Sequence, residues 1–358
     1  MIEYRLTRPA KLTQRELALW DQLQRSHREF ESPYFRPEFT LAVAAVRDDV
    51  EVLVIEEDGA AVGFLPFQRC ALNLGKPVGG RLNDFHGVLL PRGFRIDARQ
   101  LLRATRLGSW DFDHFVGDQP SFGSYVSSVE RAPYLDLSRG FAAYVDERNK
   151  AGTEVIRKTQ SRERKLEREV GELRFELETK RPDDALSRLV EWKSAQFERT
   201  GFTNLFSFPW TQQLLSCLQT SNPQLRGMIS VLWQRDEPLA IAYNLRSGPV
   251  AHGWFIAYNQ QYSTYSPGMI LMLKIAEQGA EQGVRRFHLG AGDQRFKQSL
   301  ASGHVAVSVG TIEAPTLGTM ARDTWRWTRT AAASTSWLAF CRAPGRLLKP
   351  VRSWLAYR

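Results

Sequence analysis

Two segments of alternating hydrophobic and polar residues predict the same β-hairpin in each half of the chain. Val50–Phe67 has the pattern of two strands around Asp58-Gly59, and Gly227–Leu245 has the pattern of two strands around Asp236-Glu237-Pro238. A period of two is typical of strands that bury one face, and turn residues between two such runs indicate a hairpin. The pattern therefore predicts a structural unit that occurs twice.

The segments that precede the two hairpins also correspond. Helical periodicity extends over Thr13–Arg28 in the first half and over Asp183–Thr200 in the second. In each half a segment rich in aromatic residues and proline then leads into a second helix, at Pro33–Phe39 and at Phe206–Trp210. Three features in the same order predict two copies of one α+β domain, residues 1–150 and 151–317.

The second copy contains a strand that leads through a turn into a helix. Ala251–Tyr258 has the strand pattern, and Gly268–Gln282 has apolar residues at the spacing of one buried helix face. Ser266 is expected to be the N-cap of this helix, with Pro267 at the first helical position. The first copy has no such junction, because its hairpin is followed by Gly79–Gly87.

The start of the predicted helix has the properties of an anion site. The backbone amides of the first helical turn are expected to point out of the helix end, where the helix dipole favours negative charge. These amides belong to Gly268, Met269 and Ile270. We therefore expect this site, in the second copy, to bind the pyrophosphate of an acyl or nucleotide carrier.

Two polar segments lie outside the predicted copies' cores. Thr153–Glu169 is a helix of alternating charge, interpreted as a solvated connecting helix or as a basic rim that reaches an anionic ligand through Arg157, Lys158, Arg162 and Arg164. Residues 318–358 form a basic tail with four spaced tryptophans. This tail is expected to pack on the body of the protein, or alternatively to lie on an anionic membrane surface.

Composition and missing motifs narrow the function. The net charge of +9 is compatible with an anionic cofactor, a membrane surface or a nucleic acid. The three cysteines have no C-x-x-C spacing, so neither disulfides nor a metal site is expected, and a cytoplasmic location is favoured. No signal peptide or membrane-spanning run is expected. The sequence has no P-loop, G-x-S-x-G or H-E-x-x-H motif, which argues against nucleotide hydrolysis, serine hydrolysis and zinc proteolysis.

Two motifs carry a family resemblance. Tyr265–Leu271 (YSPGMIL), followed by Gly290–Lys297 (GAGDQRFK), resembles the GNAT-type acetyltransferases of cellulose and exopolysaccharide biosynthesis clusters, the CelD/BcsL type. That family is similar to the FemAB peptidyltransferases, which carry two GNAT-like domains in one chain. The sequence departs from the family pattern at His288, where an aspartate is common, and at Phe296, where a tyrosine is usual. The resemblance implies two tandem GNAT-like lobes joined by the polar helix and followed by the basic tail.

The resemblance also implies acyl transfer from acetyl-CoA or another acyl-CoA, without a metal. We expect contacts to this cofactor from the helix start and from the neighbouring strand, at Ser266, Gly268, Met269, Ile270, Trp254 and Phe255. A backbone amide of residues 254–257 is expected to polarise the thioester if this strand separates from the next one. The candidate catalytic residues at the ends of these elements are His252, His288, Asp293, Lys297 and Tyr265. A histidine in a strand is otherwise a core residue, and Asp293 with Lys297 is otherwise a local ion pair.

The acceptor is expected to lie between the lobes. Asp84 and His86 of the first lobe face the second lobe by pseudo-symmetry, and such a polar cleft suits a sugar, a glycan intermediate or an amino compound. The alternatives are a FemAB-like transferase that uses aminoacyl-tRNA and a non-catalytic accessory subunit of a polysaccharide synthase. Apart from tRNA in the first alternative, no nucleic acid is expected, whereas the tail is expected to contact the inner membrane or the synthase.

Overall fold

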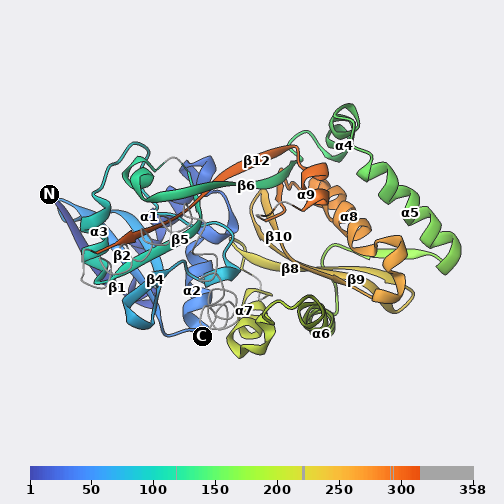
Figure 1. The fold of residues 1–358 in the computed structure, drawn as a ribbon, viewed down its shortest axis with the longest axis horizontal. Coiled ribbons are helices and arrows are strands. Elements are labelled where there is room, and N and C mark those ends of the chain that lie inside the picture. The colour runs from blue at the N-terminus through green and yellow to red at the C-terminus, as the bar shows by residue number, and fades with distance from the viewer. Residues whose placement is uncertain (118, 220–221, 291, 293, 315–358) are drawn as a thin grey trace, which may run out of the picture.

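The computed structural model describes residues 1–117, 119–219, 222–290, 292 and 294–314. The predicted tail, residues 318–358, lies outside the described residues. The strands of the described part form one 12-stranded sheet in the order β1-β2-β3-β4-β5-β12-β6-β11-β10-β9-β8-β7. Figure 1 shows the two ends of this sheet as two lobes, each flanked by helices.

The first lobe is built mainly from residues before 137. Its first two α-helices and the hairpin after them lie where the sequence patterns predict them. Its strands are β1 (Ile2–Thr7), β2 (Val50–Glu57), β3 (Ala60–Cys70), β4 (Leu74–Lys76), β5 (Ser109–Val116) and β6 (Val126–Asp136). Its helices are α1 (Gln14–Ser26), α2 (Pro37–Val46) and α3 (Ala98–Thr105). Helix α1 begins where Thr13 and Glu16 form a capping box, which satisfies backbone amides of the first turn.

The second lobe repeats this order. Its strands are β7 (Leu173–Glu176), β8 (Arg226–Gln234), β9 (Glu237–Ser247), β10 (Val250–Tyr258), β11 (Arg286–His288) and β12 (Gly303–Glu313). Its helices are α4 (Phe141–Lys150), α5 (Val155–Val170), α6 (Pro182–Thr200), α7 (Pro209–Gln219), α8 (Pro267–Glu281) and α9 (Arg295–Leu300). The connecting helix α5 ends at Gly171, as expected, where the backbone has a positive φ of 115°.

The predicted hairpins occupy equivalent positions, which confirms the repeat. The hairpin β2–β3 is second and third from one end of the sheet, and β8–β9 is second and third from the other. One detail of the prediction is wrong. Gln234 pairs with Glu237, so the second hairpin turns at Arg235-Asp236 and not at residues 236–238. A two-residue turn matches the twist of the strands, and Arg235 supplies the positive φ that it needs.

The two lobes exchange their last strands. Strand β12 of the second half pairs with β5 of the first half, and β6 of the first half pairs with β11 of the second. Strands β6 and β12 also pair with each other, so they form the bridge that runs between the lobes in Figure 1. Each lobe's sheet is therefore completed by a strand of the other, which places the ends of β10 and β11 beside first-lobe residues.

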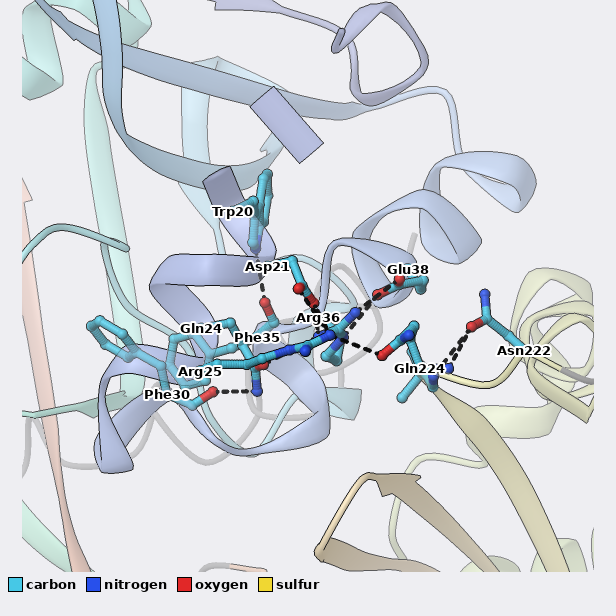
Figure 2. A network of polar contacts seen from close by, with 11 residues as sticks. Trp20, Asp21, Gln24, Arg25, Phe30, Phe35, Arg36, Glu38, Asn222 and Gln224 are labelled. Carbon is cyan, nitrogen blue, oxygen red and sulfur yellow. Dashed lines mark hydrogen bonds and ion pairs between the residues drawn. The ribbon is translucent and has the colours of Figure 1, made fainter. Parts of the chain in front are cut away.

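A polar network adds a second connection between the lobes. Figure 2 shows Arg36, whose side chain is only 2% exposed, donating to Asp21 and to Glu38. Arg25 also donates to Asp21 and reaches Gln224 of the second lobe at 3.2 Å. A buried guanidinium is stable only when its donors have acceptors, so Arg36 fixes α1 against the start of α2. The exposed hydrogen bond between Arg25 and Gln224 is the contact that reaches the second lobe.

Candidate active site

The site begins where two parallel strands separate. Strands β10 and β11 pair only at Val250–His252 with Arg286–His288. Strand β11 ends at His288, whereas β10 continues to Tyr258 along its other neighbour, β9. Beyond His252 the edge of β10 that faced β11 has therefore lost its partner strand. This is the separation on which the expected polarisation of a thioester depends.

A β-bulge in β10 changes the side-chain directions at this point. The register with β9 shifts between Gly253 and Phe255, so Trp254 is an extra residue in the strand. As a result Trp254 and Phe255 point to the same face, where Trp254 Nε1 donates to the carbonyl of Leu82 at 2.8 Å. Phe255 packs against Phe206 on that face.

The hydrogen-bond pattern of β10 identifies the amide that faces the gap. Asn259 donates to the carbonyl of Leu239 in β9. Residues of an antiparallel strand alternate in direction, so Ala257 and Phe255 also bond toward β9, and Ile256 presents its amide and carbonyl to the opposite side. The carbonyl of Ile256 accepts a hydrogen bond from Lys193 Nζ at 3.2 Å. Ile256 therefore offers a backbone N–H beside the gap.

One cavity of about 550 Å³ passes through this gap. On one face of the sheet it is lined by Ser266, Gly268 and Met269 at the start of α8, and on the other by Lys193 and Gln196 of α6. Figure 1 shows α8 and α6 on opposite sides of the second-lobe strands. The size suits an extended ligand of a few hundred Å³ that crosses the sheet from one face to the other. Further lining residues are Trp254, Phe255, Ile256, Tyr258, Phe287, Leu289, Phe296 and Lys297.

The start of α8 differs from the prediction in its capping. Ser266 occupies the N-cap position in the left-handed conformation (φ 56°, ψ 54°), and its side chain does not cap the helix. Instead the Ser266 hydroxyl accepts a hydrogen bond from Arg162 Nη1 at 3.0 Å. The predicted capping hydrogen bond of the Ser266 side chain is therefore wrong. The hydroxyl instead binds Arg162, a cation of the connecting helix α5, at the start of α8.

Two of the three predicted outward amides are already bonded. Met269 and Ile270 both donate to the carbonyl of Ser266, at 2.9 Å and 3.3 Å. Among the described residues only the amide of Gly268 lacks a partner within this first turn. The helix dipole remains, and the anion site predicted here thus consists of Gly268 with Arg162 and not of three free amides.

The two strand-end histidines face the first lobe. The His252 and His288 rings stack with centroids 5.9 Å apart. His252 is fully buried, and its Nε2 donates to Asp84 Oδ2 at 2.8 Å. Burial acts to raise the pKa of Asp84, but the hydrogen bond from His252 and the nearby His114 and Lys297 lower it below its usual value. Asp84 is therefore an ionised carboxylate that accepts a hydrogen bond from His252.

Both histidines have a ring nitrogen that is buried in the core between the lobes. The remaining nitrogen of His252, Nδ1, is buried without a partner among the described residues, as is Nδ1 of His288. Burial, together with His252 and Arg286, lowers the pKa of His288 well below its usual value. The contacts favour the alternative interpretation, in which both residues belong to the core between the lobes.

The end of β11 brings Asp84 and Lys297 together around one glycine. A side chain at Gly290, where φ is 72°, would place its Cβ 2.6 Å from Asp84 Oδ2, so only glycine fits. Lys297 Nζ donates to the carbonyl of the same glycine at 3.3 Å. Burial lowers the pKa of Lys297, and Asp84 opposes this effect. Asp293 lies outside the described residues, so its predicted pairing with Lys297 stays a prediction.

Two other predicted residues lie away from the cavity. The Tyr265 hydroxyl donates to Glu169 at 2.7 Å on the surface beside α5, and this hydrogen bond raises the pKa of Tyr265. His86 is buried in the first lobe, with its Nε2 2.7 Å from the carbonyl of Asp113. Asp84 and His86 are therefore not one cluster, and of the two only Asp84 contacts the second lobe. The roles of Tyr265 as a catalytic acid and of His86 as an acceptor contact stay predictions, and the positions of these two residues do not favour them.

Sequence reasoning missed Lys193 and Gln196. Lys193 follows Leu189 by one helical turn, and Leu189 is fully buried against the sheet. A lysine on the apolar face of an otherwise amphipathic helix was the available signal.

Metal ligands and membrane-spanning helices can be assessed for the described part of the chain. Within it no three His, Cys, Asp or Glu side chains lie close enough together to hold a metal ion. None of its helices combines the length and the apolar character that crossing a membrane requires.

Comparison with known proteins identifies a domain in the second half of the chain. Residues 154–298 match the family model of the acetyltransferase (GNAT) domain. The comparison with curated proteins gives no match. Among solved structures, FemX is 11% identical with a TM-score of 0.55, and the match covers 86% of this chain and 96% of that chain.

Two further structures share the fold over most of the chain. L-PGS from Bacillus licheniformis is 12% identical with a TM-score of 0.53, covering 86% of this chain and 94% of its own. A tandem GNAT protein from the clavulanic acid biosynthesis pathway is 12% identical with a TM-score of 0.50, covering 88% of this chain and 100% of its own. At such identities the likeness shows the fold. The chain has a tandem GNAT fold, and with the acetyltransferase domain in its second half it is an acyltransferase.

The buried His288 predicts a pH dependence of stability. Because its pKa is lower in the folded protein than the usual 6.5, the unfolded chain binds a proton below that pH that the folded protein does not. We expect this residue to cost up to about 1.4 kcal/mol of stability per pH unit as the pH falls below 6.5. The loss continues until the pH reaches the lowered pKa.

Denaturant unfolding of the wild type and of His288→Phe at several pH values measures this contribution. Other titrating groups are common to both proteins, so they cancel in the difference. The variant is expected to lose less stability than the wild type on going from neutral to mildly acidic pH. Parallel curves would contradict the assignment of a neutral, buried His288.

Proposed function

We propose that the protein transfers an acyl group, in the first instance acetyl, from acyl-CoA to an amino or hydroxyl group of a small acceptor. The observation that supports this most directly is the cavity that crosses the sheet through the gap between β10 and β11. It connects a helix N-terminus, suited to a pyrophosphate, with the buried polar groups on the α6 side. Residues 154–298, which match the acetyltransferase domain, supply nearly all of its walls.

In this proposal each wall of the cavity has one task. The Gly268 amide and Arg162 hold the pyrophosphate at the start of α8. The carrier's arm follows β10, and the amide of Ile256 donates to the thioester oxygen, where negative charge develops during attack. Trp254 and Phe255 line the same passage and enclose the acyl group. Holding the thioester in one position beside the acceptor lowers the entropic part of the barrier.

The acceptor class is proposed from Asp84, which lies where the two lobes meet. Asp84, which retains 25% exposure of its side chain, presents a carboxylate at the end of β11. Such a group suits a hydroxyl- or amine-bearing acceptor, because each donor of the acceptor needs a partner in the site. The resemblance to the CelD/BcsL type points to a sugar, a glycan intermediate or an amino compound of polysaccharide or cell-envelope synthesis. A cytoplasmic enzyme whose tail contacts the inner membrane or a synthase fits this role.

A second candidate is transfer from aminoacyl-tRNA. This is the FemAB-like alternative. FemX and L-PGS share the fold of this chain. The basic residues Arg157 and Lys158 of α5 are exposed, although both are paired with Glu154. Contact between this helix and RNA phosphates would release counterions, and binding would then fall steeply with salt.

Isothermal titration calorimetry distinguishes these functions. We expect acetyl-CoA to bind the wild type with an affinity that changes little between low and moderate salt. A tRNA that binds tightly at low salt and is lost at moderate salt, without binding of acetyl-CoA, would favour the second candidate. If neither ligand binds, the proposed activity is wrong and the accessory role remains.

A further inference from the structure

The amino group of Lys193 lies in the cavity beside the proposed position of the thioester. Lys193 projects from α6 toward β10, where its Nζ is 3.2 Å from the carbonyl of Ile256. The amide of the same Ile256 faces the gap and is the proposed donor to the thioester oxygen. The acyl carbon and the Lys193 amine are therefore placed next to the same backbone unit.

The two described hydrogen-bond partners of Lys193 are both neutral acceptors. Besides the Ile256 carbonyl, Nζ donates to Gln196 Oε1 at 3.1 Å. A neutral amine has two N–H groups and one lone pair, so these acceptors use both of its protons and leave the lone pair toward the cavity. The surroundings therefore suit an uncharged amine better than an ammonium ion, for which they supply no carboxylate among the described partners.

The electrostatics agree with this geometry. The pKa of Lys193 is lowered to about 8, mainly by burial and secondly by the charge of Lys297. A group with a pKa in this range is uncharged in a substantial fraction of molecules near neutral pH, and it still binds a proton firmly enough to remove it from an acceptor. The thiolate that leaves the thioester is basic enough to take a proton back from an ammonium group with a pKa in this range.

We propose that Lys193 is the general base of the acyl transfer, an inference that rests on the function proposed above. The acceptor's nitrogen or oxygen attacks the thioester carbon with its lone pair, and the proton of the acceptor passes to Nζ. When the carbon–sulfur bond breaks, sulfur leaves with the electron pair and receives the proton from the Lys193 ammonium. The amine is restored, the acyl group is bonded to the acceptor, and the free thiol leaves.

The other candidate bases are less well placed. His252 and His288 have their Nδ1 atoms buried in the core between the lobes, and Tyr265 is bonded to Glu169 on the surface. Lys297 lines the cavity, but it contacts the Gly290 carbonyl at the end of β11, where the Asp84 carboxylate acts to keep its charge. Lys193 alone among these residues combines a cavity position, neutral partners and contact with the Ile256 backbone.

Two substitutions of Lys193 separate a base from a binding cation. Lys193→Met removes the amine at similar length, whereas Lys193→Arg keeps a positive charge that is not lost at any working pH. Lys150→Met, which replaces an exposed lysine of α4 paired with Asp146, is the matched control. Thiol release from acetyl-CoA is measured with glucosamine as the probe acceptor and with water alone, and acetyl-CoA affinity is measured by calorimetry.

We expect both Lys193 variants to lose about a hundredfold or more in kcat. Their acetyl-CoA affinity and melting temperature are expected to stay near those of the wild type and of the control. The wild-type kcat should rise with pH through a midpoint near 8, and this rise should be absent in Lys193→Met. For Lys193→Ala, small primary amines added to the solution should restore part of the activity in proportion to their free-base concentration.

Two results would overturn this role. If Lys193→Arg retains nearly full activity, Lys193 acts as a cation and not as a base. If the wild-type kcat is independent of pH around 8 while acetyl-CoA is bound and turned over, the proton is taken by another group. If the wild type neither binds acetyl-CoA nor releases thiol, the proposed function itself fails, and the role of Lys193 fails with it.

Discussion

Replacing Gly268 with aspartate is expected to abolish acetyl-CoA binding without unfolding the protein. The new carboxylate would lie in the first turn of α8, where the pyrophosphate is proposed to bind, and like charges repel. A carboxylate near a helix N-terminus is favourable for the helix itself, by a few tenths of a kcal/mol up to about 1 kcal/mol. Calorimetric titration with acetyl-CoA measures the loss, which should exceed about a hundredfold in affinity, or roughly 3 kcal/mol.

Gly268→Ala is the matched control for size. A Cβ at this position would lie 3.4 Å from Tyr258 Cδ1 and 3.6 Å from Ile256 Cδ1, which are ordinary van der Waals contacts. The alanine variant should therefore fold normally and retain most of its affinity. Equal affinity of the aspartate variant and the wild type would exclude the start of α8 as the pyrophosphate site.

Replacing Asp84 with alanine is expected to reduce turnover and stability together while sparing acetyl-CoA affinity. Asp84 accepts the hydrogen bond from the fully buried His252, and without it the His252 Nε2–H loses its partner. Leaving a buried donor unpaired costs about 1–3 kcal/mol, to be measured by denaturant unfolding. The carboxylate next to Gly290 is also lost from the proposed acceptor cleft.

His86→Ala separates the two residues that the sequence motif placed together. His86 is buried in the first lobe against Trp110 and Phe115, so its removal should change stability but not turnover. The double variant should then have the turnover of Asp84→Ala alone. A fall in acetyl-CoA affinity in Asp84→Ala, with the fold intact, would mean that the acceptor and the carrier enter from sides opposite to those proposed.

Local signals in the sequence were sufficient for the elements and their repetition. The strand of residues 251–258 and the helix after Pro267 both form as predicted, with bounds one residue apart. These features depend on residue periodicity and on turn and capping residues, which act over a few positions along the chain. The choice of the second copy as the cofactor lobe stays a prediction, and the cavity lies in that copy.

Side-chain directions in the site could not be read from periodicity. The bulge at Trp254 shifts the alternation of β10 by one residue, and nothing in the local pattern marks it. Ser266 is a good N-cap residue by type, but its hydroxyl is bonded to Arg162, which lies 104 positions earlier in the chain. The tertiary contact therefore overrides the local preference.

The sequence was enough to predict two GNAT-like copies and a helix N-terminus for an anion, because those signals are carried by neighbouring residues. The exchange of β6 and β12, the pairing of Asp84 with His252 and the placement of Lys193 over β10 each join segments far apart in the chain. Such contacts depend on which surfaces meet when the lobes pack, and hydrophobic periodicity along the sequence does not indicate which surfaces these are. For this reason the folded chain presents a lysine of α6 at the gap, whereas the candidate bases expected from the sequence were His252, His288 and Asp293 at the ends of strands.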